Sequence, residues 1–184
     1  MMDAPTIAQV VAEVRGGAVV VSTMSVMAFA DQVSDLDFRV LGLMGAAASI
    51  GLGIAVGRPD LDVWVVDGDG SLLMQLGVLA AVADAAPPRF VHVLVDNGIY
   101  AISGAQPLPG KRDWQQLALG AGYRTVTTCT CAKELHAALV AAETGPRMVV
   151  AQCSPERPRY PTAAFAFDAG GEGARLRRAL ARPA

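Results

Sequence analysis

The stretch Val63-Trp-Val-Val-Asp-Gly-Asp-Gly-Ser71 is an apolar strand that runs directly into a turn containing glycine and aspartate. A second apolar strand, VHVLV, ends in Asp96-Asn97-Gly98. The residues between them suffice for one amphipathic helix and a turn. The pattern therefore predicts a βαβ unit, with two parallel, adjacent strands joined by a right-handed crossover. Asp69 and Asn97 should then lie together at the carboxyl edge of the sheet, where open α/β folds bind ligands.

The residues at this edge have the chemistry of a metal and phosphate site. Asp69 and Asn97 offer oxygen ligands that suit Mg²⁺, which takes one or two carboxylates and completes its shell with phosphate oxygens. The helix expected after Ser71 begins with free backbone N–H groups and the positive end of its dipole, which favour an anion. Gly68 and Gly70 leave room for close approach of the backbone. Simpler explanations stay open, because Asp69 can cap the helix and Asn97 can form a turn.

The rest of the chain alternates strand and helix signals. The helix after Ser71 should bury one face, because its apolar residues recur at spacings of three and four, and Pro87-Pro88 should end it. This alternation predicts an α/β fold, a three-layer sandwich in which helices cover both faces of a central parallel sheet. We expect one domain over residues 1–153 and a C-terminal extension over 154–184. Other helices are expected over 7–15, 45–56, 114–121, 132–143 and near 175–181, strands over 18–22, 38–41, 123–127 and 148–152, and a loop over 98–113.

Size and charge exclude several classes of function. The chain has 184 residues, enough for one domain with a full core, and a net charge of −2. It has no basic stripe, so nucleic-acid binding has no electrostatic support. The longest apolar run, 40–57, is rich in glycine and alanine and is marginally short for a membrane span. The N-terminus lacks a signal-peptide pattern, and three cysteines fit a reducing cytoplasm better than a disulfide scaffold.

Upstream of the βαβ unit, Leu41-Gly-Leu-Met-Gly-Ala-Ala-Ala48 adds a second motif. Together with GDG and the spaced asparagine, it resembles the thiamine diphosphate (ThDP) fingerprint of the pyruvate-decarboxylase-like superfamily. The resemblance implies that Gly42 offers its carbonyl to the aminopyrimidine and that Met44 wedges the cofactor into a bent shape, although a methionine there can simply be core. The implied metal ligands are Asp69, Asn97 and the backbone carbonyl of Ile99, and the implied cofactor-binding residues are Gly42, Met44, Gly68, Gly70, Ser71 and Ile99.

The resemblance covers residues 18–152 and is strongest over 41–106. The chain is similar to the two-subunit sulfopyruvate and phosphonopyruvate decarboxylases through MGAAASIGLGIAVGRPD, DGDGSLLMQLG and DNGIYAISGAQ. This similarity implies decarboxylation of a 2-oxo acid with ThDP and Mg²⁺. Carboligase or acyl-transferring chemistry stays open, as does a noncatalytic cofactor-binding subunit. A Rossmann-like nucleotide-binding protein is a further alternative from a different class.

The loop after the metal motif is the candidate substrate contact. Tyr100, Ser103 and Gln106 could meet an oxo-acid carboxylate, although a solvated loop explains them almost as well. The related decarboxylases carry a Thr-Gly pair where this chain has Ile102-Ser103-Gly104. The stretch 23–27, TMSVM, is also less polar than its counterpart in the phosphonopyruvate enzymes. We therefore hypothesise a substrate more apolar than a sulfonate or phosphonate.

One part of the family's active site is missing from the sequence. In the family, a glutamate on a separate pyrimidine-binding domain contacts the cofactor, usually from a neighbouring subunit. No segment here resembles that domain, and the chain is too short to hold both. The resemblance therefore implies a hetero-oligomer in which a pyrimidine-domain partner supplies the activating glutamate. The catalytic residue within this chain stays unassigned.

Overall fold

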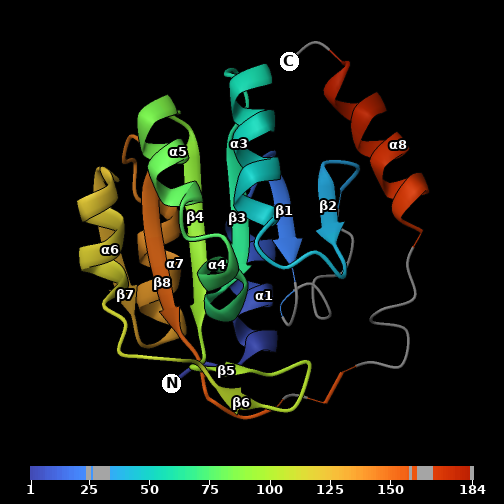
Figure 1. Ribbon diagram of the computed structural model, residues 1–184. Coiled ribbons are helices and arrows are strands. Elements are labelled where there is room, and N and C mark those ends of the chain that lie inside the picture. The colour runs from blue at the N-terminus through green and yellow to red at the C-terminus, as the bar shows by residue number, and fades with distance from the viewer. Residues whose placement is uncertain (24–25, 27–33, 158, 161–167, 183–184) are drawn as a thin grey trace.

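The computed structural model describes residues 1–23, 26, 34–157, 159–160 and 168–182. Within them, six parallel strands form one sheet in the order β2-β1-β3-β4-β8-β7 (Figure 1). A short antiparallel ladder, β5-β6, lies beyond the carboxyl end of the sheet. The strands are β1 (Val19–Thr23), β2 (Asp37–Val40), β3 (Val63–Gly68), β4 (Phe90–Asp96), β5 (Ile99–Tyr100), β6 (Gln106–Pro107), β7 (Thr125–Cys129) and β8 (Arg147–Gln152).

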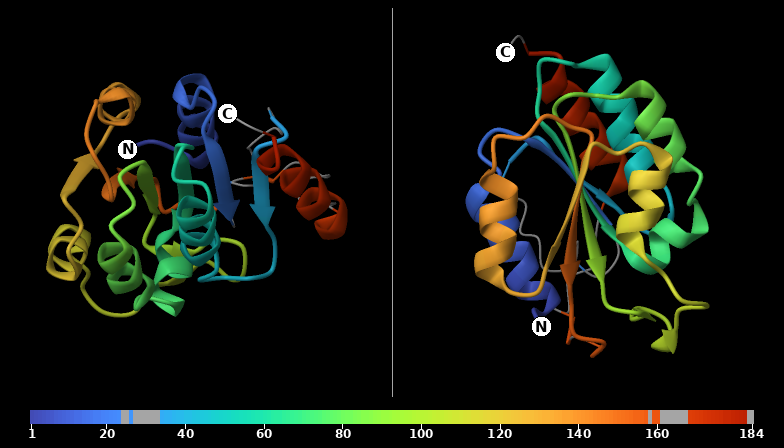
Figure 2. Two further views of the ribbon diagram at one scale, coloured as in Figure 1. Left: turned by 90° about the horizontal axis from the view of Figure 1, so that it is seen from above. Right: turned by 90° about the vertical axis from the view of Figure 1, so that its left-hand side faces the viewer.

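Helices cover both faces of the sheet (Figure 2). One face is covered by α1 (Ala4–Val14) and α7 (Ala132–Val140). The other face is covered by α3 (Ala47–Gly57), α4 (Asp69–Met74), α5 (Val78–Ala85) and α6 (Trp114–Ala121), with α8 (Ala169–Leu180) packed beside β2. The predicted three-layer α/β sandwich is confirmed.

The central strands have apolar side chains on both faces, as buried parallel strands require. On β3, Val63 and Val65 pack against α3 and α5, whereas Trp64 and Val66 pack toward α1 and α7. The parallel register pairs Gly68 at the end of β3 with Val95 near the end of β4. The two strand tips therefore end at the same edge, as the βαβ pattern predicted.

Several predicted element boundaries differ from those observed. The first helix starts at Ala4 rather than residue 7, because Asp3 caps it: its Oδ1 accepts the Thr6 N–H at 2.9 Å. The prediction of one continuous helix after Ser71 is wrong. The chain leaves the helical conformation at Gln75 (φ −141°, ψ 47°), which separates α4 from α5.

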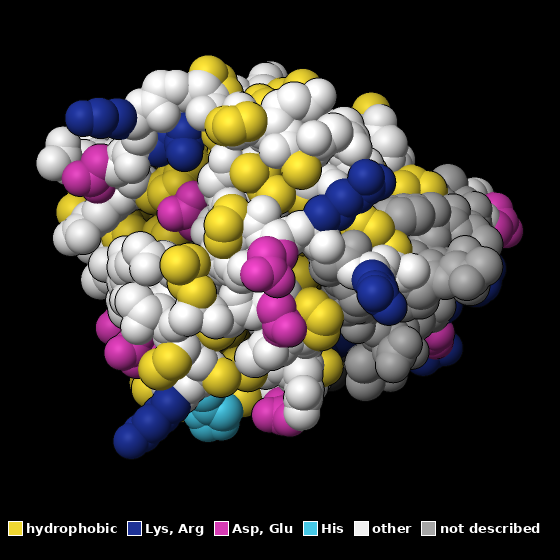
Figure 3. Space-filling model, turned by 90° about the horizontal axis from the view of Figure 1, so that it is seen from below, with side chains coloured by type: hydrophobic (Ala, Val, Ile, Leu, Met, Phe, Trp, Pro, Cys, Tyr) yellow, Lys and Arg dark blue, Asp and Glu magenta, His cyan; other side chains and the backbone are white. Residues whose placement is uncertain are grey.

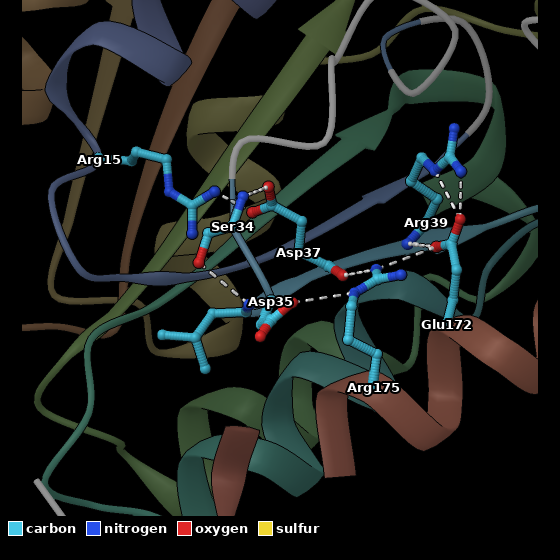
Figure 4. Close-up of polar contacts among 8 residues, drawn as sticks. Arg15, Ser34, Asp35, Asp37, Arg39, Glu172 and Arg175 are labelled. Carbon is cyan, nitrogen blue, oxygen red and sulfur yellow. Dashed lines mark hydrogen bonds and ion pairs between the residues drawn. The ribbon is translucent and has the colours of Figure 1, made fainter. Parts of the chain in front are cut away.

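The C-terminal helix α8 begins well before residue 175 because its contacts with the edge strand β2 outweigh the low helix propensity of its glycines. Glu172 accepts the Arg39 backbone N–H at 3.1 Å and the Arg39 Nε–H at 2.8 Å (Figure 4). Arg175 donates to the Asp37 carbonyl at 3.0 Å. Asp37 and Arg39 are alternate residues of an edge strand, so α8 satisfies outward backbone groups that would otherwise invite another strand.

Two further features bear on the predicted class of protein. None of the helices in the described ranges is long and apolar enough to cross a lipid bilayer. The apolar run over 40–57 instead supplies the end of β2, a turn and α3. Cys129, Cys131 and Cys153 are free thiols.

Candidate functional site

A cavity of about 120 Å³ lies where β3 and β4 end. Figure 3 shows this edge of the molecule face-on, with acidic, basic and hydrophobic side chains interspersed. The predicted site residues that line the cavity are Met44, Gly68, Asp69, Gly70, Ser71, Asn97, Ile99, Tyr100 and Ser103. The other lining residues are Thr23, Val26, Val95, Ala101 and Ile102. Thr23 and Val26 belong to the stretch 23–27, and Ala101 and Ile102 to the loop over 98–113, both of which the sequence linked to the substrate, whereas nothing in the sequence indicated Val95.

Asp69 joins the two strand tips. It is the first residue of α4 and is 2% exposed. Its Oδ1 accepts the Gly70 N–H at 2.7 Å, and its Oδ2 accepts the Gly98 N–H at 2.6 Å, across from the end of β4. The carboxylate is therefore fixed between the two turns, as the prediction of a shared edge required.

The charge of Asp69 is not compensated within the described part of the chain. Burial raises the pKa of its carboxyl group, the Gly98 and Gly70 N–H groups oppose that rise, and the nearby Asp96 adds to it. No lysine, arginine or histidine in the described ranges forms an ion pair with it. A buried carboxylate with an acidic neighbour and no basic partner favours an external cation. Asp96 was not predicted, although it ends the strand before Asn97.

The remaining candidate metal ligands are neutral oxygens. The Asn97 Oδ1 atom accepts the Ile99 N–H at 3.0 Å and keeps a second lone pair. The described residues contain no group of three or more His, Cys, Asp or Glu side chains placed to hold a metal. A cation here would therefore need amide and backbone oxygens beside Asp69. Such hard oxygen donors, few of them charged, suit Mg²⁺ completed by phosphate oxygens rather than Zn²⁺.

The two glycines of the turn have different surroundings. An added Cβ at Gly68 would meet nothing within 4 Å, so this position is open as predicted. At Gly70 an added Cβ would lie 2.7 Å from the Tyr100 ring, so that space is filled by an aromatic side chain. The Gly70 N–H already donates to Asp69. Gly70 is thus needed for Tyr100 to pack over the start of α4, which sequence reasoning did not foresee.

The upstream motif forms a turn between β2 and α3. Gly42 (φ 71°) and Gly45 (φ 83°) occupy the left-handed region that favours glycine. Met44, between them, lines the cavity and is half-buried. Gly42 is exposed and lies outside the cavity lining. The turn therefore brings Met44, but not Gly42, to the wall of the cavity.

The candidate substrate loop is partly closed on itself. Ser103 lines the cavity, and its hydroxyl donates to the Gln106 Oε1 at 3.1 Å. The same oxygen accepts the Gly104 N–H at 3.0 Å. Gln106 is exposed and outside the lining, so its side chain holds the loop rather than facing the cavity. Of the predicted substrate contacts, the structure places Tyr100 and Ser103 at the cavity.

A family model, the C-terminal TPP binding domain of thiamine pyrophosphate enzymes, matches residues 16–153. The chain belongs to the thiamine pyrophosphate enzyme family. The matched range contains every residue of the cavity lining, and α8 lies beyond it. Family membership confirms the resemblance carried by GDG and the upstream motif, and it supports thiamine diphosphate as the cofactor.

Relatives in the thiamine pyrophosphate enzyme family include decarboxylases. Phosphonopyruvate decarboxylase of Streptomyces viridochromogenes is 44% identical over 118 residues, 62% of this chain and 30% of that protein. Sulfopyruvate decarboxylase subunit beta of Methanococcus maripaludis is 32% identical over 128 residues, 68% of each. The solved structure of a Mycobacterium smegmatis enzyme, described as thiamin diphosphate-dependent, matches with TM-score 0.70 and 25% identity over 84% of this chain and 32% of that one. The chain thus spans less than a third of the Streptomyces relative.

Proposed function

We propose that this chain is the diphosphate- and Mg²⁺-binding subunit of a heteromeric ThDP-dependent enzyme that decarboxylates a small 2-oxo acid. Family membership and relatives named as decarboxylases support the reaction. The name "subunit beta", carried by relatives from three organisms, supports a partner subunit. We place the assembly in the cytoplasm, which the three free cysteines favour.

The observation that carries this proposal is the carboxylate of Asp69. It is buried between two strand tips, lies near Asp96, and has no basic partner in the described ranges. Leaving such a charge uncompensated costs stability unless a cation binds there. In our proposal, Asp69, Asn97 and the Ile99 carbonyl hold Mg²⁺, which in turn holds the diphosphate.

The other cofactor contacts are proposed from the motif and its position. The backbone at Gly68, Gly70 and Ser71 would border the diphosphate, with Gly68 offering the open approach. Met44 would support the cofactor from the cavity wall, and the Gly42 carbonyl would meet the aminopyrimidine. When bound, ThDP supplies the electron sink that decarboxylation of a 2-oxo acid requires. The chain's own residues bind and orient it, and the apolar lining limits access of water.

The activating glutamate belongs to the partner in this proposal. None of the glutamates in the described ranges lines the cavity. We propose that residues 1–153 form the ThDP-binding domain, that 154–184 form an extension, and that a pyrimidine-domain subunit covers the cavity to complete the site. Release of an aldehyde is proposed over ligation or acyl transfer, because the named relatives are decarboxylases.

The test is calorimetry with ThDP and Mg²⁺ on this chain together with its pyrimidine-domain partner. We expect ThDP binding that requires Mg²⁺ and is weakened at least a hundredfold by Asp69→Ala. A matched control, Asp113→Ala, removes an exposed helix cap outside the cavity lining and should leave binding unchanged. Turnover of a panel of 2-oxo acids should yield CO₂ and an aldehyde only when both subunits are present. Binding that ignores Mg²⁺ and Asp69, or tight binding of NAD instead, would refute the proposal.

A further inference from the structure

Three buried polar side chains lie beneath the cofactor site and do not line the cavity. Asp67 on β3, His92 on β4 and Tyr123 before β7 are 1%, 0% and 3% exposed. The His92 Nδ1 atom lies 3.1 Å from the Tyr123 hydroxyl, and its Nε2 lies 3.9 Å from the Asp67 Oδ2. Neither of these last two atoms has a hydrogen-bond partner among the described residues. Sequence reasoning gave no functional role to any of the three.

The hydrogen bond between Tyr123 and His92 has a definite direction. Burial lowers the pKa of His92 to about 4, so its imidazole is neutral near pH 7 and carries one N–H. That proton belongs on Nε2, facing the Asp67 carboxyl group, because the opposite tautomer would turn a lone pair toward it. The Tyr123 hydroxyl then donates to Nδ1. Polar hydrogens thus point from Tyr123 through His92 toward Asp67.

Ser71 connects this row to the turn that carries Met44. Its side chain is 1% exposed, and its hydroxyl lies close enough to Asp67, in the same strand-to-helix unit, to lower the pKa of that carboxyl group. The Ser71 Oγ also accepts the Gly45 N–H at 2.9 Å. The hydroxyl therefore gives a lone pair to Gly45 and has Asp67 as its acidic neighbour, which leaves the Ser71 backbone amide as the group available to an external anion.

Gly45 is packed directly on α4. A Cβ added there would lie 2.8 Å from the Cβ of Gln75 and 3.5 Å from the Ser71 carbonyl oxygen. Its φ of 83° is also a conformation that other residues rarely adopt. The turn bearing Met44 therefore rests on α4, and the contact holding it in register is the bond from Gly45 to Ser71.

We propose that the Ser71 hydroxyl, oriented by Asp67 and His92, is a positioning group that fixes the Met44–Gly45 turn on α4. It thereby couples the aminopyrimidine side of the cofactor site to the diphosphate side. The role of the turn in cofactor binding rests on the proposed function, whereas the coupling of Gly45 to Ser71 does not.

The first experiment measures amide hydrogen exchange at Gly45 in the full chain without cofactor. Ser71→Ala leaves the buried Gly45 N–H without its acceptor, so its exchange should accelerate roughly tenfold or more. The matched control is Val91→Ala, which weakens the core on the opposite face of the sheet and should not change Gly45 selectively. Unchanged exchange at Gly45 in Ser71→Ala would overturn the inference, whether or not the chain binds ThDP.

The second experiment separates positioning from direct phosphate binding by calorimetry on the chain with its partner. Ser71→Ala should weaken Mg²⁺–ThDP binding about tenfold and leave Mg²⁺–pyrophosphate binding within about twofold, because only ThDP uses the turn. Equal weakening of both ligands would mean that the hydroxyl binds phosphate directly, and would overturn the inference. A wild-type protein that binds neither ligand would refute the proposed function, while the exchange result would still stand.

The third experiment tests the row behind Ser71. His92→Gln keeps a nitrogen donor near the Nε2 position, whereas His92→Phe removes it. Exchange at Gly45 should accelerate in His92→Phe and return toward wild type in His92→Gln. The two variants are compared at urea concentrations that give them the same free energy of unfolding. Identical exchange at Gly45 in both would show that His92 only fills space and does not help to orient Ser71.

Discussion

Buried acids occur in two regions of this molecule, and they have opposite surroundings. Beside the edge strand β2, Asp37 pairs with Arg15, and Glu172 pairs with Arg39 (Figure 4). At the carboxyl end of β3, Asp67 and Asp69 are similarly buried, but no lysine or arginine in the described ranges pairs with them. A buried acid with an arginine holds the fold together. Asp69, which lines the cavity without a basic partner in the described ranges, marks the place where a ligand is expected to provide the charge.

The two arrangements also differ in energy. Breaking a buried ion pair by removing one partner is costly, because the other charge is left uncompensated. A buried acid without a partner instead lowers the stability of the unliganded protein, a cost that functional sites commonly carry. Substitutions of the acids in the two regions should therefore change the free energy of unfolding in opposite directions.

The largest effect is expected at the β2 edge. Glu172→Ala should lower the free energy of unfolding by about 3 kcal/mol, because Arg39 loses its carboxylate and the β2 edge loses an acceptor. Urea denaturation measures this change. The control, Asp62→Ala, breaks the exposed pair with Arg89 and should cost less than about 1 kcal/mol. Equal losses in both variants would show that α8 does not depend on this ion pair.

A second effect concerns pH and Asp67. Burial raises its pKa to about 6 from 3.8, although Ser71 and the Gly68 N–H oppose the rise. Because the folded pKa lies above the unfolded one, this group stabilises the fold below pH 4, and that contribution is lost as pH rises to about 6. The loss is at most about 3 kcal/mol. Urea unfolding from pH 4 to 7 should show a shallower decline for Asp67→Asn. Identical pH profiles would contradict the raised pKa.

A smaller and opposite effect is expected from Asp69. Without ligands at pH 8, Asp69→Asn should raise the free energy of unfolding by about 1–2 kcal/mol, because it removes a buried charge next to Asp96. The wild-type protein should instead gain stability from Mg²⁺ with ThDP, about 2.7 kcal/mol at a hundredfold excess over Kd. Thermal or urea unfolding with and without ligands measures both. If Asp69→Asn is less stable than wild type without ligands and is still stabilised by Mg²⁺–ThDP, the proposed contrast between Asp69 and the paired acids at the β2 edge is wrong.

The smallest effect is expected at Gln106. Its side chain is exposed and bonds within its own loop, to Ser103 and Gly104. Gln106→Ala should change the free energy of unfolding by less than about 0.5 kcal/mol and kcat/KM of the assembled enzyme by less than about twofold. Steady-state kinetics with the partner present checks this. A tenfold or larger fall in kcat/KM would instead support the prediction from the sequence that Gln106 contacts the substrate.

Much of the fold was predictable because its signals are local. The strand over 63–68, the turn glycines and the helix over 114–121 depend on residues close together in sequence. The division of the helix after Ser71 was missed because the apolar spacing of three and four continues across the break at Gln75, although Gly77, the N-cap residue of α5, lies just beyond it. The early start of α8 was also missed. Its glycines indicate a flexible segment, whereas Glu172 and Arg175 bind a strand far away in sequence.

The candidate site was predictable to a similar extent. Asp69, Asn97 and Met44 were identified from motifs, and the structure places all three at one cavity. The predicted contacts Gly42 and Gln106 lie outside it. The hypothesis of an apolar substrate came from two methionines, Met24 and Met27. Both lie outside the residues that the structure describes. Thr23 and Ile102, from the two stretches that differ from the related decarboxylases, do line the cavity, whereas Val95 lines it with no indication in the sequence.

The sequence by itself determined which chemical groups reach the edge of the sheet, because strand periodicity and a glycine turn fix where a βαβ unit ends. Only the tertiary structure decided which groups face one another there. The packing of Tyr100 over Gly70, the bond from Gly45 to Ser71 and the buried row behind it join elements far apart in the chain. Such contacts depend on how strands and helices pack in three dimensions, which no local pattern of residues records.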